Sequence, residues 1–286
     1  MSTREDLVDV PGARLFVRQV GDGPALVLVN GGPGMSHDYM RPLEAIASAT
    51  LRVVTYDQRG CGRSAFPDPP RFHMRDYVAD LEAIRAHLAL DRIHLLGHSW
   101  GGLVCQAFAG KHPRRVASLT LVGSMAPWFE DNRGGQQELQ DRIDELSDLG
   151  IIPNPMPKNE GDNCKATSLA MLPAYLADPE QPTPGPLEDT AFSSSVYHAT
   201  VDRLGGYDLR QRLRELVAPT TIFIGQLDPF GTGTARSTAR SLAGAFPEIV
   251  VLPGVGHYPW LEREDFVHEL RSLMHRRLET PSDQDR

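Results

Sequence analysis

A serine flanked by glycines is the feature of this sequence with the clearest chemical potential. Residues 97–101 have the order Gly-His-Ser-Trp-Gly, and the apolar run 93–96 before them is typical of a buried strand. A serine in this setting stands on a sharp turn between a strand and a helix, with its hydroxyl exposed above the sheet. The glycines two residues before and after Ser99 leave room for that turn. The pattern predicts Ser99 as a nucleophile that forms a covalent intermediate.

Ser99 needs a general base, because a serine hydroxyl is a poor nucleophile near neutral pH. His257 ends a glycine-rich loop that follows an expected strand at 248–252. Asp228 follows an expected strand at 220–225 and supplies a carboxylate that can orient the histidine and compensate its charge. The order serine, aspartate, histidine is typical of α/β-hydrolases. We predict these three residues as a catalytic triad; the alternatives are a structural histidine and a turn-forming or helix-capping aspartate.

The negatively charged oxygen of an acyl-transfer intermediate requires two hydrogen-bond donors. In this arrangement the residue after the nucleophile supplies one backbone N–H, here that of Trp100, and a loop after an early strand supplies the other. Residues 30–34, Asn-Gly-Gly-Pro-Gly, directly follow the apolar run 25–29. Their glycines allow the backbone to approach a substrate closely. We predict the second donor in this loop; a plain turn is the alternative.

Three sequence blocks carry a family resemblance. They are residues 31–39 (GGPGMSHDY), 56–64 (YDQRGCGRS) and 97–102 (GHSWGG). These blocks resemble the signatures of the proline iminopeptidase branch of the α/β-hydrolases. The resemblance implies release of N-terminal residues, proline above all, through an acyl-enzyme, with Gly31 and Trp100 as oxyanion donors. It also implies that residues 57–62 brace the oxyanion loop and that their arginine is buried in hydrogen bonds.

Two positions depart from the family pattern. Asn30 stands where the first block usually begins with histidine, and Pro229 stands where an acid that binds the substrate's ammonium group commonly follows the triad aspartate. Without such a carboxylate, burial of an ammonium group is costly. The acids of the expected lid that could compensate are Glu130, Asp131, Asp202 and Asp208. The predicted substrate contacts are Asn30, Gly32, Trp128, Glu130 and Tyr258.

The elements that must position these residues alternate between strand and helix. Strand patterns occupy residues 14–20, 25–29, 51–56, 93–96, 116–122, 220–225 and 248–252, and helical patterns occupy 77–88, 102–109 and 266–278. This alternation predicts an α/β-hydrolase fold: a mostly parallel central sheet flanked by helices, with a helical lid inserted between core strands. The first two strands are expected to pair antiparallel across a turn at 21–24.

The alternation stops between about residues 124 and 206. Helical patterns at 139–149 and 169–176 are separated by proline-rich stretches there. We expect a helical lid over Ser99; a disordered linker is the alternative. The predicted organisation is a hydrolase core in two parts, 1–123 and 207–278, a lid at 124–206 and a flexible tail at 279–286.

Composition limits the possible partners. The formal charge is −8, with acids and arginines intermixed, so no nucleic-acid partner is expected. No apolar run approaches the length of a membrane span, and the amino terminus does not have the pattern of a signal peptide, so we expect a cytoplasmic protein without membrane contact. The three cysteines, Cys61, Cys105 and Cys164, are far apart and predicted to be free. No metal site and no cofactor are expected.

The sequence therefore predicts a serine hydrolase that acts on a small-molecule ester, lactone or amide, or on a short peptide. Three alternatives stay open: a true prolyl aminopeptidase, an acyltransferase or other tailoring enzyme for a specialised metabolite, and a noncatalytic receptor on a hydrolase scaffold. The oligomeric state is open as well. Four apolar lid residues could line a pocket or meet a second subunit: Trp128, Phe129, Leu172 and Tyr175.

Overall fold

The computed structural model describes residues 2–279, and within them eight strands form one sheet. The spatial order is β1-β2-β4-β3-β5-β6-β7-β8. The strands are β1 Thr3–Val10, β2 Ala13–Val20, β3 Ala25–Val29, β4 Arg52–Tyr56, β5 Ile93–His98, β6 Val116–Val122, β7 Thr220–Gly225 and β8 Glu248–Leu252. β2 pairs antiparallel with both β1 and β4, and all other neighbours are parallel. The α/β-hydrolase fold predicted from the sequence is confirmed.

The expected pairing of the first two predicted strands is wrong. β4 lies between β2 and β3, so β3 has the parallel neighbours β4 and β5. The burial of the strands explains this order. Every residue of β3 is buried, which suits an interior strand covered on both faces, whereas β2 has a half-exposed pattern that suits a place near the edge of the sheet.

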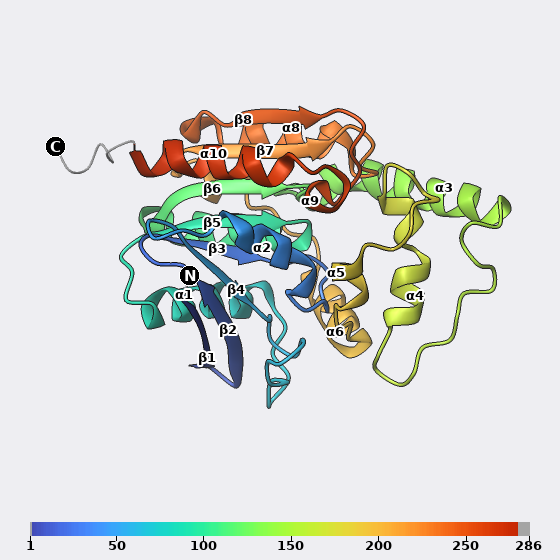
Figure 1. The fold of residues 1–286 in the computed structure, drawn as a ribbon, viewed down its shortest axis with the longest axis horizontal. Coiled ribbons are helices and arrows are strands. Elements are labelled where there is room, and N and C mark those ends of the chain that lie inside the picture. The colour runs from blue at the N-terminus through green and yellow to red at the C-terminus, as the bar shows by residue number, and fades with distance from the viewer. Residues whose placement is uncertain (1, 280–286) are drawn as a thin grey trace.

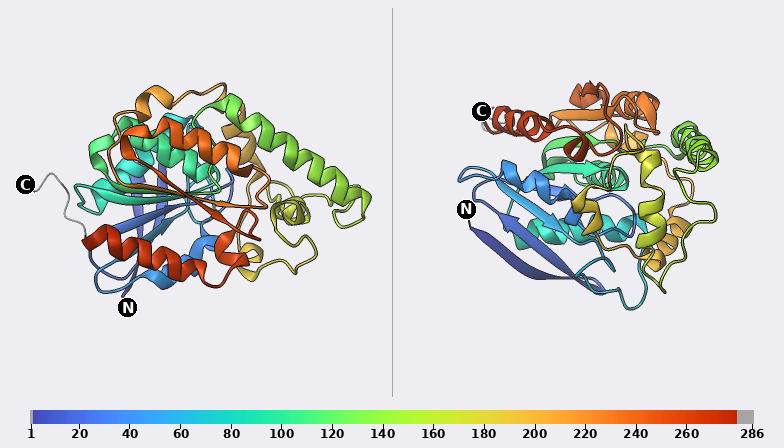
Figure 2. Two further views of the ribbon diagram at one scale, coloured as in Figure 1. Left: turned by 90° about the horizontal axis from the view of Figure 1, so that it is seen from above. Right: turned by 45° about the vertical axis from the view of Figure 1, so that its right-hand side comes forward.

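Helices cover both faces of the sheet (Figure 1; Figure 2, left). One face carries α1 Met74–His87, α2 Trp100–Lys111 and α8 Gly231–Ser241, and the other carries η1 Asp38–Ile46, α9 Pro259–Glu262 and α10 Phe266–Glu279. The short helices η2 Pro113–Arg115 and η5 Ala243–Ala245 lie in connecting segments. Glu279, the first residue of the predicted tail, belongs instead to α10. The other residues of that predicted tail, 280–286, lie outside the described residues.

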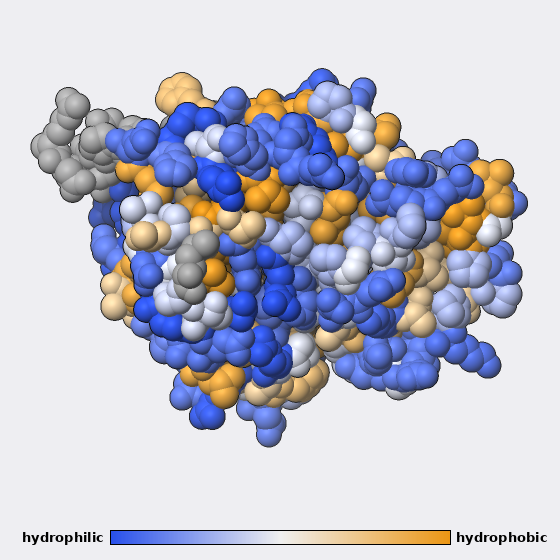
Figure 3. All heavy atoms as spheres, in the orientation of Figure 1, coloured by the Kyte–Doolittle hydropathy of each residue, from blue (hydrophilic) through white to orange (hydrophobic). Residues whose placement is uncertain are grey.

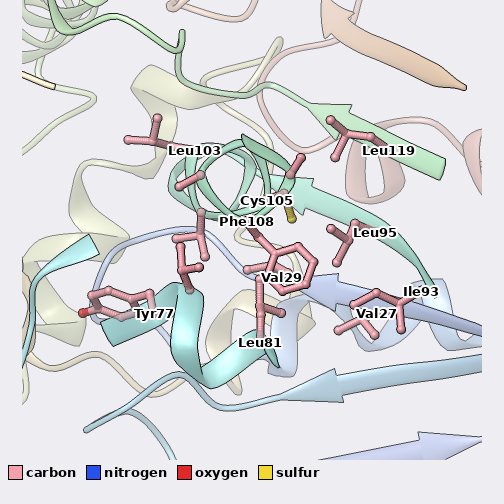
Figure 4. Packing of buried hydrophobic residues seen from close by; sticks show 14 of the residues in the cluster. Val27, Val29, Tyr77, Leu81, Ile93, Leu95, Leu103, Cys105, Phe108 and Leu119 are labelled. Carbon is pink, nitrogen blue, oxygen red and sulfur yellow. The ribbon is translucent and has the colours of Figure 1, made fainter. Parts of the chain in front are cut away.

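α2 is the most deeply buried of these helices. Residues 100–109 are all buried, and the helix packs against both α1 and the sheet (Figure 4). Leu103 and Phe108 lie among the apolar side chains of β3, β5 and α1. Cys105, predicted to be a small core residue, is fully buried there as a free thiol. This packing fixes the helix that begins directly after Ser99.

The segment between β6 and β7 contributes no strand to the sheet and forms a largely helical insertion (Figure 1, green to yellow). Its elements are η3 Phe129–Asn132, α3 Arg133–Asp148, α4 Lys165–Ala170, η4 Leu172–Tyr175, α5 Gly185–Glu188, α6 Ser194–Leu204 and α7 Arg210–Leu213. Figure 2 shows α3 projecting beyond the sheet. Leu209 and Leu213 return to the main core cluster.

The molecular surface agrees with the mixed charge pattern of the sequence. The face drawn in Figure 3 is mostly hydrophilic, with apolar atoms in separate patches. Among residues 2–279, no helix combines the length and the apolar character needed to cross a membrane.

His94 makes the stability of this core sensitive to acid. Burial, with Arg92 as a second cause, lowers the pKa of His94 from 6.5 to about 4, and its Nδ1 lies 2.8 Å from Ser118 Oγ. The unfolded chain therefore binds the proton more readily, so stability falls as the pH drops below 6.5 towards 4. Between about pH 7 and pH 5 we expect His94 to contribute a loss of about 2 kcal/mol.

Urea unfolding at these two pH values tests the expectation, with His94→Gln as the comparison. The variant is expected to be less stable at pH 7 but to lose less stability on acidification than the wild type. An unchanged pH dependence in His94→Gln would contradict this assignment.

Candidate active site

Ser99 occupies a strained turn between β5 and α2. Its backbone has φ 53° and ψ −119°, a conformation that side-chain-bearing residues rarely adopt. The Ser99 N–H donates to the carbonyl oxygen of Val122 on the adjacent strand, with an N···O distance of 3.0 Å. The half-buried Ser99 thus stands at the carboxyl end of a central strand, where the N-terminus of α2 begins.

The two glycines of the motif allow this turn to pack closely. A Cβ on Gly97 would lie 2.6 Å from the carbonyl oxygen of Gly101, and a Cβ on Gly101 would overlap the carbonyl oxygen of Val29. Neither distance is tolerated between real atoms. The strand and the helix therefore approach one another only because both positions lack a side chain.

His257 and Asp228 come together from loops after β8 and β7. His257 Nδ1 lies 2.7 Å from Asp228 Oδ2, and each residue is at most 3% exposed. Asp228 Oδ1 accepts a hydrogen bond from the backbone N–H of Phe230 at 2.9 Å. The buried carboxylate is thereby oriented so that one oxygen faces the imidazole, an arrangement that can stabilise an imidazolium.

The loop that carries His257 is fixed by the lid and by α9. The backbone N–H of His257 donates to Tyr175 O in η4, with an N···O distance of 2.8 Å. The Glu262 carboxylate accepts from the backbone N–H groups of Gly256 at 3.0 Å and Tyr258 at 2.9 Å. The imidazole is thus presented on a braced backbone, although Gly254 and Gly256 precede it in the sequence.

The loop after β3 engages one of the two N–H groups that the sequence assigns to the oxyanion hole. The backbone N–H of Gly31 donates to the Tyr39 hydroxyl, with an N···O distance of 2.5 Å, so this donor is already engaged. Asn30 Nδ2 lies 3.2 Å from Gly31 O. Because C=O and N–H point in opposite directions across a trans peptide, this contact directs the Gly32 N–H away from Asn30. Gly32, and not Gly31, lines the cavity beside Ser99.

Gln58 connects Trp100 of α2 with the loop that follows β3. Its Oε1 accepts from Trp100 Nε1 at 3.0 Å, and its Nε2 donates to Asn30 O at 2.6 Å. Arg59 makes a bidentate ion pair with Asp80, with N···O distances of 2.8 and 2.6 Å, and is 1% exposed. The block that was expected to brace the oxyanion loop therefore does so through Gln58, and its arginine is buried in hydrogen bonds as predicted.

A cavity of about 320 Å³ opens over Ser99, between the core and the inserted helices. Among the described residues that line this cavity there is no Asp, Glu, Lys or Arg. Burial raises the pKa of Tyr175 and of Tyr258, so both phenols are neutral. The lining residues are Gly32, Pro33, Gly34, Met35, His98, Ser99, Asn159, Cys164, Thr167, Ser168, Met171, Leu172, Tyr175, Phe192, Ser193, Ser194, Tyr197, His198, His257 and Tyr258.

Two of the five predicted substrate contacts, Gly32 and Tyr258, line this cavity. Asn30 is fully buried behind it. Trp128 and Glu130, which are also predicted to contact substrate, do not line this cavity. Trp128 forms a β-bridge with Asp208 and lies beneath the Arg210 guanidinium, whereas Glu130 pairs with Arg133 at the surface. Local partners therefore hold both side chains away from Ser99.

Most of the lid residues at the cavity were missed by the sequence reasoning. Four of them, at positions 164, 167, 168 and 171, have the spacing of one helical face around α4. Positions 194, 197 and 198 repeat that spacing on α6. This face mixes polar and apolar side chains, so hydrophobic periodicity could not reveal it; helical spacing within the predicted lid was the only available signal.

Among the described residues, one group offers metal-ligand atoms close together: His37, Asp38 and Asp57, within 4.8 Å of one another. Asp57 Oδ1 accepts from the backbone N–H of His37 at 3.0 Å and lies 2.7 Å from its Nδ1. Asp57 Oδ2 accepts from the backbone N–H of Arg63 at 2.8 Å. The carboxylate is thus used to hold two loops together.

The chain also matches known proteins over most of its length. Residues 24–148 match a family model described as alpha/beta hydrolase fold. A proline iminopeptidase from Lactobacillus helveticus (strain DPC 4571) is 41% identical over 273 residues, which cover 89% of this chain and 91% of that protein. The chain belongs to the proline iminopeptidase-like α/β-hydrolases. A proline iminopeptidase from Levilactobacillus brevis is 30% identical over 294 residues, covering 92% of this chain and 93% of the relative.

Solved structures share the fold of this proline iminopeptidase-like hydrolase. A proline iminopeptidase from Mycobacterium smegmatis has a TM-score of 0.75 at 22% identity, over 96% of this chain and 99% of that one. An esterase from Exiguobacterium antarcticum has a TM-score of 0.70 at 23% identity, over 94% and 98%. Because these identities are low, the two likenesses show the fold alone.

The acids of the lid do not replace the carboxylate that this hydrolase lacks at Pro229. Asp131 accepts from Ser237 Oγ, Asp208 pairs with Arg210, and Asp202 is exposed on α6. None of them lines the cavity. One further carboxylate of the lid, that of Asp162, contacts the cavity wall, because its Oδ2 accepts from Ser193 Oγ at 2.6 Å. Sequence reasoning did not single out Asp162.

Proposed function

We propose that this protein is a serine hydrolase that cleaves an uncharged ester or amide through an acyl-enzyme on Ser99. The observation that carries the proposal is the convergence of Ser99 and the His257–Asp228 pair on one cavity, in whose lining the described part of the chain places no acidic or strongly basic side chain. A covalent mechanism needs the nucleophile and the base on one cavity wall. An uncharged substrate follows from the absence of a charged partner in that wall.

The proposed reaction has two half-reactions. The Ser99 hydroxyl attacks the substrate carbonyl while His257 Nε2 accepts its proton, and Asp228 stabilises the resulting imidazolium. The imidazolium then protonates the departing alcohol or amine as its bond to the acyl carbon breaks. Water, deprotonated by the same imidazole, attacks the acyl-enzyme, and Ser99 recovers its proton on release of the acid.

We assign the two oxyanion donors to the backbone N–H groups of Trp100 and Gly32. Trp100 is the first residue of α2, and N–H groups in the first turn of a helix have no partner within the helix. The helix dipole favours negative charge at the same place. Gly32 replaces Gly31 in this role, because the Gly31 N–H donates to Tyr39.

A prolyl aminopeptidase is the second candidate, because relatives as similar as 41% identical have the name proline iminopeptidase. That activity requires the site to hold a free secondary ammonium next to the scissile carbonyl. The described lining supplies hydroxyl, amide, imidazole and phenol groups for this purpose but no carboxylate. A buried cation without a carboxylate is disfavoured, so we place neutral acyl groups ahead of free N-terminal proline.

A matched pair of anilides tests this preference. We expect the kcat/KM for N-acetyl-prolyl p-nitroanilide to exceed that for prolyl p-nitroanilide, because acetylation removes the charge that the cavity does not compensate. The ratio of free to blocked activity should rise as the pH passes about 8, where a free α-amine loses its proton. Enzyme groups whose titration affects both substrates equally, such as the catalytic histidine, do not change this ratio.

A preference for the free prolyl substrate of about 100-fold, or about 2.7 kcal/mol, would favour the aminopeptidase instead. In that case Asp162→Asn should remove the preference, since the Asp162 carboxylate belongs to the lid and is bonded to Ser193 of the cavity wall. Glu130→Gln is the matched control, because Glu130 lies outside the lining and pairs with Arg133.

A further inference from the structure

A buried hydrogen-bond chain connects the oxyanion loop with the loop that carries His257. It runs from the backbone N–H of Gly31 to the Tyr39 hydroxyl at 2.5 Å, from that hydroxyl to His98 Nδ1 at 2.9 Å, and from His98 Nε2 to the carbonyl oxygen of His257 at 2.9 Å. Tyr39 and His98 are at most 1% exposed. The chain spans η1, β5 and the loop after β8.

The direction of every bond in this chain follows from its end groups. A backbone carbonyl only accepts, so His98 Nε2 carries the proton and donates to His257 O. Burial lowers the pKa of His98 well below its usual value, with the proximity of His257 as a further cause, so the ring is neutral and Nδ1 accepts. The Tyr39 O–H therefore donates to Nδ1, and its oxygen accepts from Gly31. Burial raises the pKa of Tyr39, which keeps this donor protonated.

The rings of the chain are held by aromatic packing. Tyr39 stacks on Trp260 with centroids 5.9 Å apart, and Trp260 Nε1 donates to the Tyr39 carbonyl oxygen at 2.9 Å. The ring centroids of His98 and His257 lie 4.6 Å apart. A Cβ built on Gly31 would lie 3.1 Å from three atoms: His98 Nδ1, Ser99 Cβ and the Tyr39 hydroxyl oxygen. The chain thus passes directly beside the nucleophile.

We propose that Tyr39 and His98 are positioning residues that set the oxyanion loop relative to the catalytic base. This inference rests on the proposed function. The Gly31 N–H bond fixes the start of the loop, so that the next N–H, that of Gly32, is aimed at the developing oxyanion. Alignment of this kind matters in the transition state more than in the ground state, so its loss is expected to lower kcat with little change in KM.

Tyr39→Phe is the direct test, because it removes one hydroxyl and keeps the packed ring. Tyr207→Phe is the matched control: the Tyr207 hydroxyl likewise accepts an N–H, from Asn132 at 3.0 Å, and donates, to Ala126 O at 3.1 Å, but Tyr207 lies outside the cavity lining. With p-nitrophenyl butyrate we expect Tyr39→Phe to lower kcat about tenfold or more while KM changes less than about twofold. Tyr207→Phe should keep the wild-type kcat.

The rate at which a fluorophosphonate labels Ser99 provides the second readout. Tyr39→Phe should label to the same final stoichiometry as wild type but more slowly, because phosphonylation also develops negative charge on oxygen. Thermal unfolding of both variants shows whether they lose similar stability. A wild-type kcat and labelling rate in Tyr39→Phe, or equal kcat losses in both variants, would overturn the positioning role while leaving Ser99 as nucleophile. Failure of wild-type Ser99 to label would overturn the proposed function, and this inference with it.

Discussion

Replacing Ser99 with alanine is expected to lower kcat by at least about 1,000-fold, because the covalent step disappears. The substitution removes one oxygen from a half-buried position and should leave the fold intact. The residual rate would come from the oxyanion donors and from binding. Steady-state hydrolysis of p-nitrophenyl butyrate, with circular dichroism to verify folding, measures the effect.

Ser147→Ala provides the control for this loss. Ser147 lies on α3 and does not line the cavity, so the variant should retain the wild-type rate. A Ser99→Ala enzyme that kept more than about a tenth of the wild-type kcat would exclude Ser99 as the nucleophile.

Asp228→Asn is expected to lower kcat by about 10⁴-fold without unfolding the protein. The asparagine oxygen can still accept from the Phe230 N–H, so its amide nitrogen faces His257 Nδ1. His257 Nδ1 must then accept a hydrogen bond from the amide N–H, which leaves the proton of a neutral imidazole on Nε2. In this tautomer His257 cannot take the proton of Ser99.

Asp208→Asn is the matched comparison, because this aspartate makes an ion pair with Arg210 in a partly exposed setting. We expect it to change kcat less than about twofold, since exposed ion pairs contribute little. Comparable losses in kcat for the two variants would remove the basis for assigning the buried aspartate to the triad.

Local pattern was sufficient to predict the parts of the site that depend on one strand and one turn. The spacing of Gly97, Ser99 and Gly101 predicts a strained turn, and the structure has a positive φ at the serine. The loops after two late strands predict the approach of Asp228 to His257, which lie in hydrogen-bond contact. These features follow from the order of elements, because parallel strands end at the same edge of a sheet.

Contacts between distant segments could not be predicted in the same way. The sequence of residues 14–29 suggests a hairpin, yet β4 lies between β2 and β3, so that the fully buried β3 has parallel neighbours on both edges. Gly31 is adjacent to Gly32, and only the position of Tyr39 shows which N–H is already engaged. The displacement of Trp128 and Glu130 from the cavity likewise depends on partners that are chosen in three dimensions.

The most direct test of the central claim is the location of a covalent adduct after treatment with a fluorophosphonate. We predict one adduct per chain, found by mass spectrometry on the peptide that contains Ser99, with loss of esterase activity in proportion to labelling. Ser99→Ala should take up no label. Two results would contradict the account. One is labelling at another residue in proportion to the loss of activity, and the other is full hydrolytic activity in a protein whose Ser99 is completely modified.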